Sequence, residues 1–399
     1  MDLDRSSPTP TTSTSTLILT PTTSKRSSTT TRNTNRHSPP LPTTLLGPIP
    51  VTTLSAISWR KAYPRVGQFA ITASEEVIAA GPRGLFYFKR VQDHASKPWS
   101  EARLLSSTPA TVNDSFVSGL AIHSSKERLD VYCVSRGVLH SFYRSAKTDP
   151  SFAVNSRPPL STYAVSGTPA VATTVKDPQR WSLVVPCQSG GLLHTSTTSP
   201  SSSGSYGSEW DPVDHVAKGL GVISAVSITT IRTGDGYPPR NIAIVAACVA
   251  SARLHTLEGL VERKSGYYAS SFYEWKAQAS TMISHPGEVT GNPVLINGGP
   301  AENQLDLLVP SAEGGVFHFI RTDSTPDEWH MIARITFPPS LPIASCLALN
   351  VDFLGYRKRE FKALVQSGGR IYQVKTYEGA KPWSGSYLKP IVYPGPFSD

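Results

Sequence analysis

Short apolar segments alternate with turns that contain Gly or Ser along the chain from about residue 50 onward. Most of these segments lead, through such a turn, into a four-residue motif that begins with Gly or Ala and ends with His or Tyr. A strand, a tight turn and a second strand predict a β-hairpin. Successive copies start 53, 54, 61, 63 and 54 residues apart, which indicates an internal repeat. The motif occupies residues 84–87, 137–140, 191–194, 252–255, 315–318 and 369–372.

Two further strands complete the repeating unit. A strand of small residues, for example 119–122, precedes each hairpin, and small residues are expected where strands crowd around an axis. Four strands in each of six units predict an all-β fold, a six-bladed β-propeller with four-stranded blades. A fourth element closes each unit. It carries Tyr163 in the second unit and a Trp in the others, namely Trp99, Trp210, Trp275, Trp329 and Trp383. The expected blades span about 65–105, 116–163, 166–214, 222–280, 289–336 and 343–392.

The first part of the chain has a different composition. Residues 1–48 consist mainly of Ser, Thr and Pro, and such a segment buries too little apolar surface to offset the entropy of ordering it. We expect a disordered tail there and the propeller over residues 49–399. Trp59 lies in a segment that resembles the closing strands. It predicts an N-terminal strand at 51–60 that pairs with the last blade and closes the ring, which removes free sheet edges.

Composition excludes several other classes. With 39% hydrophobic and 17% charged residues and 34 Pro, the chain lacks the Leu, Glu and Lys content of helical bundles. The net charge of +9 is spread without a dense basic block, so we expect no nucleic-acid partner. No apolar run reaches a membrane-spanning length. The N-terminus carries Asp2 and Asp4 where a signal peptide is cationic, so we expect a cytoplasmic protein, with non-classical secretion as the alternative.

The cysteines and the repeated histidines have structural interpretations. Cys133, Cys187 and Cys248 each lie four residues before a repeat motif, so they are expected to be small packing residues, one per blade, and not disulfide partners. None of the four cysteines, Cys346 included, belongs to a CxxC pair. The motif histidines also fall one per blade. We expect half-buried rings with a hydrogen bond each, and no metal site.

The fifth unit has the sequence motif that is most specific for a known family. It combines Gly291-Asn292-Pro293, an apolar strand ending in Val309-Pro310, the pair Gly314-Gly315, an aromatic-His strand at 317–318 and Trp329. This motif resembles the blade sequences of the lectin-like propellers of bacteria and fungi that group with the fucose-binding lectins. The third unit echoes it in 184–186 and 190–191. The resemblance implies a propeller over about residues 60–395.

The same resemblance implies sugar sites at blade interfaces, each with an Arg, an acid and an aromatic residue. Arg321 with Asp323 provides such a pair in the fifth unit, whereas the other units have only partial counterparts, such as Arg144 in the second and Thr197 in the third. The sequence therefore predicts no recurrent sugar sites. It favours a single site, placed by preference in the central cavity.

Polar residues on the innermost strands are candidates to line that cavity. His123 is the one among them that titrates near neutrality, so we expect it to be the catalytic acid or base if the protein is an enzyme. Arg321 joins the expected ligand-binding residues because of the fifth-unit motif. The others are Gln68, Thr72, Thr173, Thr229, Asn297 and Asn350.

Three functions remain open at this point. Motifs for phosphate loops, nucleophile elbows, zinc sites and dinucleotides are absent. The first hypothesis is an enzyme of fungal secondary metabolism without a cofactor, since lectin-like propellers in such pathways are used as hetero-Diels–Alder pericyclases that join a tropolone to a terpene. Such an enzyme needs a pocket that orients two reactants and polarises a carbonyl. The alternative is a lectin for fucose-type glycans without catalysis, and the third is a scaffold for proteins. The expected partner is thus a small organic ligand or a glycan.

Overall fold

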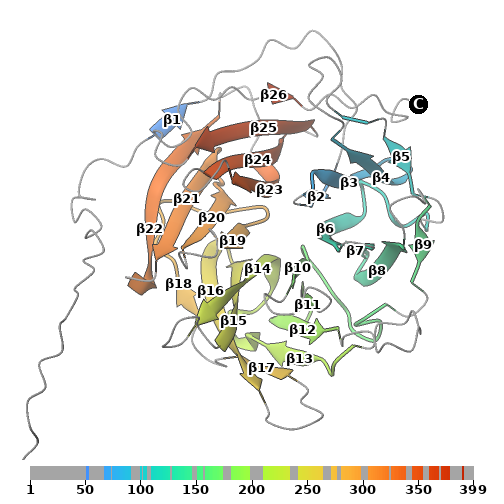
Figure 1. Cartoon of the computed structure of the whole chain (residues 1–399), viewed down its shortest axis with the longest axis horizontal. Helices are drawn as coiled ribbons and strands as arrows, with labels where there is room; N and C mark the ends of the chain where they lie inside the picture. Colours follow the sequence, from blue (N-terminus) through green and yellow to red (C-terminus); the bar gives the residue numbers. More distant parts are fainter. Residues whose placement is uncertain are drawn as a thin grey trace, which may run out of the picture. The chain divides into compact units, whose positions relative to one another are not determined.

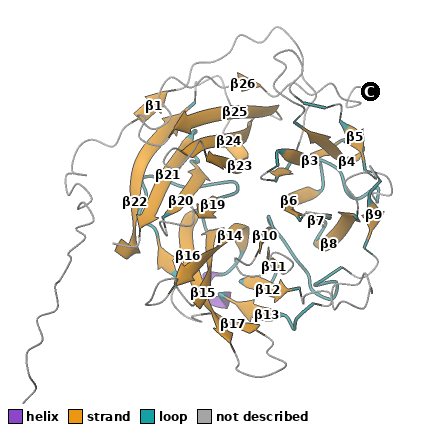
Figure 2. Ribbon diagram, in the orientation of Figure 1, coloured by secondary structure: helices purple, strands orange, loops and turns teal. Residues whose placement is uncertain are grey.

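In the computed structural model, the regular secondary structure of the described residues is almost wholly β-strand (Figure 2). This confirms the all-β prediction. The described residues contain one helix, the 3-10 helix η1 (Lys218–Leu220), and no helix long and apolar enough to cross a membrane. By its contacts the chain divides into residues 1–48 and 49–399. The structure describes residues 51–53, 67–72, 74–90, 99–100, 102–105, 109–125, 128–145, 151–155, 158–173, 181–197, 210–233, 241–263, 271–275, 280–297, 304–322, 325–337, 344–353, 359–367, 370–377 and 389–390.

The strands form six sheets, numbered I to VI along the chain, and in each sheet the first strand leads to the second, third and fourth in order. Sheet I consists of β2 (Phe69–Ile71), β3 (Glu76–Gly81), β4 (Gly84–Lys89) and β5 (Arg103–Leu104). Sheet II consists of β6 (Val117–Ser124), β7 (Leu129–Ser135), β8 (Val138–Arg144) and β9 (Ala153–Val154). Sheet III consists of β10 (Ala170–Thr173), β11 (Trp181–Pro186), β12 (Leu192–Ser196) and β13 (Asp214–Val216).

The second half of the chain repeats this plan with longer strands. Sheet IV consists of β14 (Ile223–Thr233), β15 (Asn241–Ala250), β16 (Arg253–Arg263) and β17 (Ser271–Trp275), with β18 (Thr281–Met282) also on β16. Sheet V consists of β19 (Val294–Asn297), β20 (Leu305–Pro310), β21 (Val316–Thr322) and β22 (Thr325–Thr336), with β1 (Val51–Thr53) on β22. Sheet VI consists of β23 (Ala344–Phe353), β24 (Arg359–Ser367), β25 (Arg370–Tyr377) and β26 (Lys389–Pro390).

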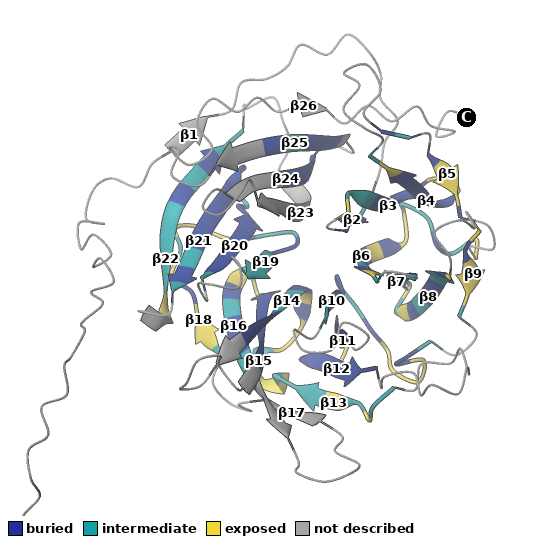
Figure 3. Cartoon of the chain, in the orientation of Figure 1, coloured by how far each residue is buried: buried dark blue, intermediate teal, exposed yellow. Residues whose placement is uncertain are grey.

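The second strand of a sheet is covered on both faces by the neighbouring sheets. Every residue of β7, β11 and β20 is buried, as the dark strands in Figure 3 show. A strand buried on both faces reads as a continuous apolar run, which explains the segments recognised in the sequence. Tight turns then return the chain into the third strand. In sheet II this turn holds Arg136 and Gly137 at positive φ, as a two-residue hairpin requires.

The six sheets pack side by side through their first strands. These strands contact one another in the cyclic order β2, β6, β10, β14, β19, β23 and back to β2, and they face a common centre in Figure 1. The sheets remain separate, since no ladder of hydrogen bonds runs through all of them among the described strands. Separate twisted sheets packed through their innermost strands make a propeller-like fold.

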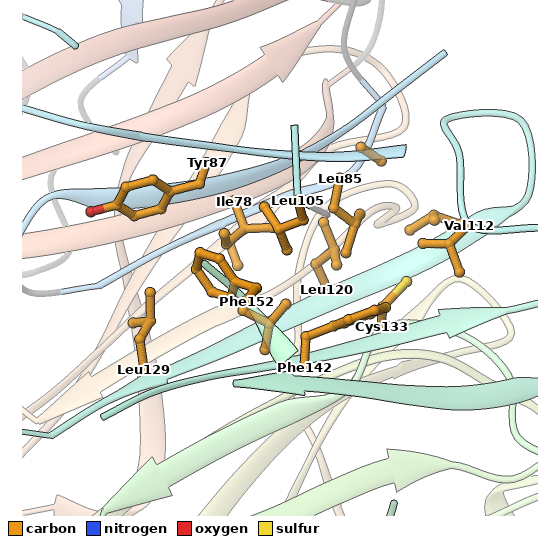
Figure 4. Packing of buried hydrophobic residues seen from close by; sticks show 14 residues of the cluster. Ile78, Leu85, Tyr87, Leu105, Val112, Leu120, Leu129, Cys133, Phe142 and Phe152 are labelled. Atoms are coloured by element: carbon orange, nitrogen blue, oxygen red, sulfur yellow. The ribbon is translucent and has the colours of Figure 1, made fainter. Parts of the chain in front are cut away.

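Apolar side chains fill each space between consecutive sheets. Figure 4 shows the cluster between sheets I and II, where Ile78 and Leu85 of sheet I meet Leu120, Cys133 and Phe142 of sheet II. Cys133 packs here as a small apolar residue, and burial raises the pKa of its thiol. Cys187 and Cys248 are likewise buried and free, as predicted. The side chain of Cys346 lies outside the described residues.

The motif histidines make hydrogen bonds in two of the sheets, as the sequence predicts, but His194 and His318 are there fully buried and not half-buried. The ring of His194 accepts a hydrogen bond at Nδ1 from Trp275 (3.1 Å), and Nε2 of His318 lies 2.9 Å from the carboxylate of Asp306. In sheet IV, by contrast, Nδ1 of His255 has no partner among the described residues.

A polar network joins three sheets near the common centre. Asn292, which precedes β19, donates from Nδ2 to Oε1 of Gln68 in sheet I (3.1 Å), and its Oδ1 accepts from Thr168 of sheet III (2.6 Å). Both contacts link residues more than a hundred positions apart in sequence. Gln68 is thus used to hold sheets together near the axis, where the sequence predicted a ligand-binding side chain.

Substitution Asn292→Ala should lower the free energy of unfolding by about 1–3 kcal/mol, because Gln68 and Thr168 would each lose a partner in a mostly buried place. Urea denaturation of both proteins measures the difference. Asn113→Ala is a suitable control, since the side chain of Asn113 bonds to Ala110 and Ser115 of its own turn. Equal losses in the two variants would show that the network near the axis contributes nothing special.

The N-terminal strand does not lie where the sequence predicted. β1 pairs in parallel with β22, so Val51 lies opposite Arg334 and the strand extends sheet V. The prediction that this strand completes the last sheet is therefore wrong. β22 is the longest strand of sheet V and would otherwise end that sheet with an exposed edge, which β1 covers. Trp59 lies outside the described residues, as does the predicted disordered tail.

Candidate functional site

Two clusters at sheet interfaces combine an arginine, a carboxylate and an aromatic ring. The first, called the Arg144 site, lies between sheets I and II. Nη2 of Arg144, the last residue of β8, donates to Oε1 of Glu76, the first residue of β3 (2.7 Å). The guanidinium carbon lies 4.8 Å from the ring centroid of Tyr87 and 5.5 Å from that of Phe152. Figure 4 shows that the Tyr87 hydroxyl points away from the apolar cluster.

The carboxylate of Glu76 is held firmly in its charged form. Burial by itself would raise the pKa of Glu76. Hydrogen bonds from Tyr87 (2.7 Å) and Arg144, and the charge of that arginine, outweigh burial and lower the pKa. Ser74 donates to Oε2 (3.2 Å), and the backbone N–H of Glu76 donates to Thr72 (3.1 Å). Burial, and then the bond to Glu76, raise the pKa of Tyr87 to about 12, so its hydroxyl remains a donor.

The second cluster, called the Arg321 site, lies between sheets IV and V. Nη1 of Arg321 on β21 donates to Oε1 of Glu258 on β16, and the guanidinium carbon lies 5.5 Å from the ring centroid of Trp329 on β22. The side chains of Arg321 and Glu258 are 9% and 30% exposed, against 8% and 13% for Arg144 and Glu76. The Arg321 site is therefore the more open of the two.

This combination of groups suits a sugar ring. A guanidinium offers several fixed N–H donors and a carboxylate offers acceptors, so neighbouring hydroxyl groups of a pyranose can bind to both at once. An aromatic ring beside them provides an apolar surface for the C–H face of the sugar. Such a combination of groups can bind a neutral polyol.

The interface between sheets II and III is filled in another way. Thr197 stands where a sheet-ending arginine would be, and its hydroxyl accepts the backbone N–H of Trp181 (3.1 Å). Trp181 in turn stacks on His123, with ring centroids 4.6 Å apart, and donates from Nε1 to the hydroxyl of Tyr132 (2.9 Å). Side chains of the protein itself thus occupy this interface, which leaves it less suited to a ligand.

His123 consequently lies far from the role that the sequence predicted. It is 5% exposed, packed between two sheets, and its Nε2 has no partner among the described residues. Burial, and then the nearby charge of Arg128, lower the pKa of His123 to about 4. The ring is therefore neutral at pH 7 and sealed from solvent, so this placement does not support acid–base catalysis in a central cavity.

The buried histidines predict acid sensitivity. The pKa of His123 falls from 6.5 to about 4 on folding, so between these values the unfolded chain binds a proton that the folded chain does not. The contribution of His123 to the free energy of unfolding should stay constant above pH 6.5. It should decrease by about 3 kcal/mol as the pH falls from 6.5 to 4. Denaturation of His123→Phe, which keeps an aromatic ring against Trp181, should show a smaller decrease over the same pH range. An equal decrease would contradict this assignment.

The other predicted ligand residues lie on or next to the innermost strands. Thr72 contacts Glu76, so it belongs to the support of the Arg144 site. Asn297 donates to the backbone carbonyl of Thr230 (3.1 Å), and Thr230 donates to that of Thr173 (3.0 Å), which links sheets V, IV and III. Thr229 is half-buried beside this chain of contacts. The side chain of Asn350, on β23, lies outside the described residues, and so does Asp323, the predicted partner of Arg321.

The sequence analysis did not pair the acids of the two sites with their arginines, for one reason. It paired Arg321 with Asp323, two positions away, whereas the structure pairs it with Glu258, 63 positions earlier and in the preceding sheet. Arg144 likewise takes Glu76 from the preceding sheet. A search for acids one repeat earlier would have found both partners. No group of three or more metal-ligating side chains is present in the described part of the chain.

Comparisons with known proteins find solved structures with a similar fold. A mutant of the Aleuria aurantia lectin in complex with alpha-methyl-L-fucoside superimposes with a TM-score of 0.50 at 12% identity, over 84% of this chain and 99% of that chain. The BP39L lectin from Burkholderia pseudomallei has a TM-score of 0.50 at 15% identity, over 83% of this chain and 100% of that one. The chain has the fold of these lectins. The resemblance recognised in the fifth unit is thereby confirmed at the level of the fold. No family model matches the chain, and no curated protein matches its sequence.

Proposed function

We propose that the protein is a carbohydrate-binding module that takes a fucose-type glycan at the Arg144 and Arg321 sites. The observation that carries this proposal is the Arg321 site, where Arg321, Glu258 and the ring of Trp329 meet between two sheets and the carboxylate is partly open to solvent. The lectin fold supports it. In this proposal the six sheets are the blades of a six-bladed propeller, and sheet VI packs on sheet I to complete it.

The two sites are expected to act independently. Sheet III separates them along the chain, since sheets I and II hold one site and sheets IV and V the other. In a ring of six blades they would lie on opposite sides, so one molecule could hold two glycan ends. We expect the Arg321 site to bind more tightly, because its carboxylate is less covered by the protein.

A glycan array tests this function on folded protein. We expect binding to fucosylated glycans, with no binding to the same glycans after removal of fucose. Absence of any bound glycan would contradict the proposal. The pericyclase interpretation stays a prediction: the described residues add no support to it, and His123 lies in the wrong place for its expected role.

A further inference from the structure

One end of the sheets gathers exposed apolar side chains. This end, called the turn end, is where the second and third strands of each sheet join, for example at Arg136–Gly137 in sheet II and Ser251–Ala252 in sheet IV. The first strands begin there too, because they run antiparallel to the second strands. Val117 at the start of β6 pairs with Ser135 at the end of β7, and Ile223 pairs with Ala250 in the same way.

The hydrogen-bond register places six large apolar residues at this end. One of them is Leu104, which pairs with Phe86 just after the sheet I turn. Val138 pairs with Ser135, Phe116 directly precedes Val117, and Val222 directly precedes Ile223. Tyr163 is two residues before Val165, whose N–H donates to Gly137, and Met282 pairs with His255 beside the sheet IV turn. Such side chains are usually scattered singly over a surface. The exposed fractions are 44% for Leu104, 39% for Phe116, 49% for Val138, 39% for Tyr163, 63% for Val222 and 59% for Met282.

Basic residues accompany them at the same end. Arg83, Arg136 and Arg253 lie in or directly after the turns of sheets I, II and IV, and all three are exposed. Lys218 of helix η1 is also exposed and lies beside Gly191 in the sheet III turn. The guanidinium carbon of Arg136 lies 3.6 Å from the ring centroid of Phe116, so this charge sits directly on the apolar surface.

Acidic residues at this end are fewer than basic residues, and some of them already form contacts within the protein. Glu313 in the sheet V turn forms an ion pair with Arg334 (2.9 Å). Asp114 is half-buried, and its N–H donates to the carbonyl of Gly81. Glu288 and Asp214, which lies opposite His194 of sheet III, are exposed and are the two remaining acids that we place here among the described residues. The turn end therefore combines apolar side chains with a positive charge.

We infer that the turn end docks on an anionic phospholipid membrane. Exposed Val, Met and aromatic side chains can enter the boundary between headgroups and acyl chains, while Arg and Lys remain at the level of the anionic headgroups. A nucleic acid would call for a denser array of cations, and the aliphatic side chains would gain nothing from it. A symmetric dimer through this face would bring its own cations together, which is unfavourable.

Membrane docking would leave the proposed sugar sites open. Arg144 pairs with Leu129, the first residue of β7, and Arg321 pairs with Leu305, the first residue of β20. The turns follow the last residues of β7 and β20, so both arginines lie at the opposite end of their strands. The two surfaces can therefore be tested separately, and loss of one need not affect the other.

Vesicle flotation of the full chain tests the inference. We expect the protein to float with vesicles of phosphatidylcholine mixed with phosphatidylserine, and much less with phosphatidylcholine alone. Removal of one exposed cation, as in Arg253→Gln or Lys218→Gln, should weaken partitioning about fivefold, and added salt should do the same. The double variant Val222→Ser/Met282→Ser should lose most of the binding.

A matched control separates this effect from a general loss of apolar surface. Val154 is 44% exposed and lies on the outermost strand β9, where it pairs with Phe142, away from the sheet II turn. Val154→Ser should float like the parent protein, whereas Val222→Ser, which also removes one exposed valine, should float less. Circular dichroism of each variant checks its fold. Equal flotation of Val154→Ser and Val222→Ser, no flotation at all, or binding to RNA in place of vesicles would overturn the inference. A dimer that Val222→Ser/Met282→Ser dissociates would overturn it as well.

Discussion

The double variant Arg144→Ala/Arg321→Ala should lose measurable binding of α-methyl-L-fucoside. Each arginine donates the charge-assisted hydrogen bonds of its site, and loss of such bonds weakens affinity about tenfold to a hundredfold per site. The single variant Arg321→Ala should remove the tighter class of sites and leave the Arg144 site. Isothermal titration with the fucoside measures both affinity and the number of sites.

A lysine at the same position tests the geometry of the donor. Arg321→Lys keeps the positive charge but loses the planar fork, so it should bind the fucoside more weakly than the parent protein. The control is Arg90→Ala. Arg90 forms an ion pair with Glu75 within sheet I (2.8 Å), with side chains 20% and 16% exposed. Because that pair lies within one sheet, its loss should leave fucoside binding unchanged. A similar loss in Arg90→Ala and Arg321→Ala would refute the assignment of the sites.

The variant Gly119→Ala should destabilise the fold by at least about 3 kcal/mol, since a side chain there has no room that repacking could supply. A Cβ at Gly119 would lie 2.3 Å from Cα of Thr168, so backbone of sheet II meets backbone of sheet III. The first strands approach this closely because they crowd around the common centre. Urea denaturation measures the effect.

A glycine in open space gives the matched comparison for that variant. Nothing lies within 4 Å of a Cβ placed on Gly219 in helix η1. Gly219→Ala should therefore change the free energy of unfolding by less than about 0.5 kcal/mol. If Gly119→Ala were as mild, the close approach of the first strands would not be a feature of the protein in solution.

The repeat made the sheets predictable. Each second strand is buried on both faces, so β11 and β20 appear in the sequence as apolar runs, and the turns after them carry the glycines that positive φ requires. The sequence predicts these elements correctly because the residues of each strand and of the turn after it are adjacent in the chain. The place of β1 could not be read in this way, since its pairing depends on which sheet edge was free.

The candidate sites were less predictable because they form between sheets. Glu258 reaches Arg321 only when sheet IV packs on sheet V, and no local pattern records that contact. For His123 the strand register was clear, but the sequence could not show whether its ring faced the centre or Trp181 of the next sheet. Asn292 stood out in the sequence as part of a motif, yet its contacts with Gln68 and Thr168 cross between sheets I, III and V.

A crystal structure of the protein grown with α-methyl-L-fucoside tests the central claim most directly. The account predicts the sugar between sheets IV and V, with its hydroxyls on Arg321 and Glu258 and its C–H face on Trp329. At higher ligand concentration a second molecule should lie beside Arg144 and Glu76. A fucoside bound at the common centre of the sheets, or absent from both interfaces at a saturating concentration, would contradict the account.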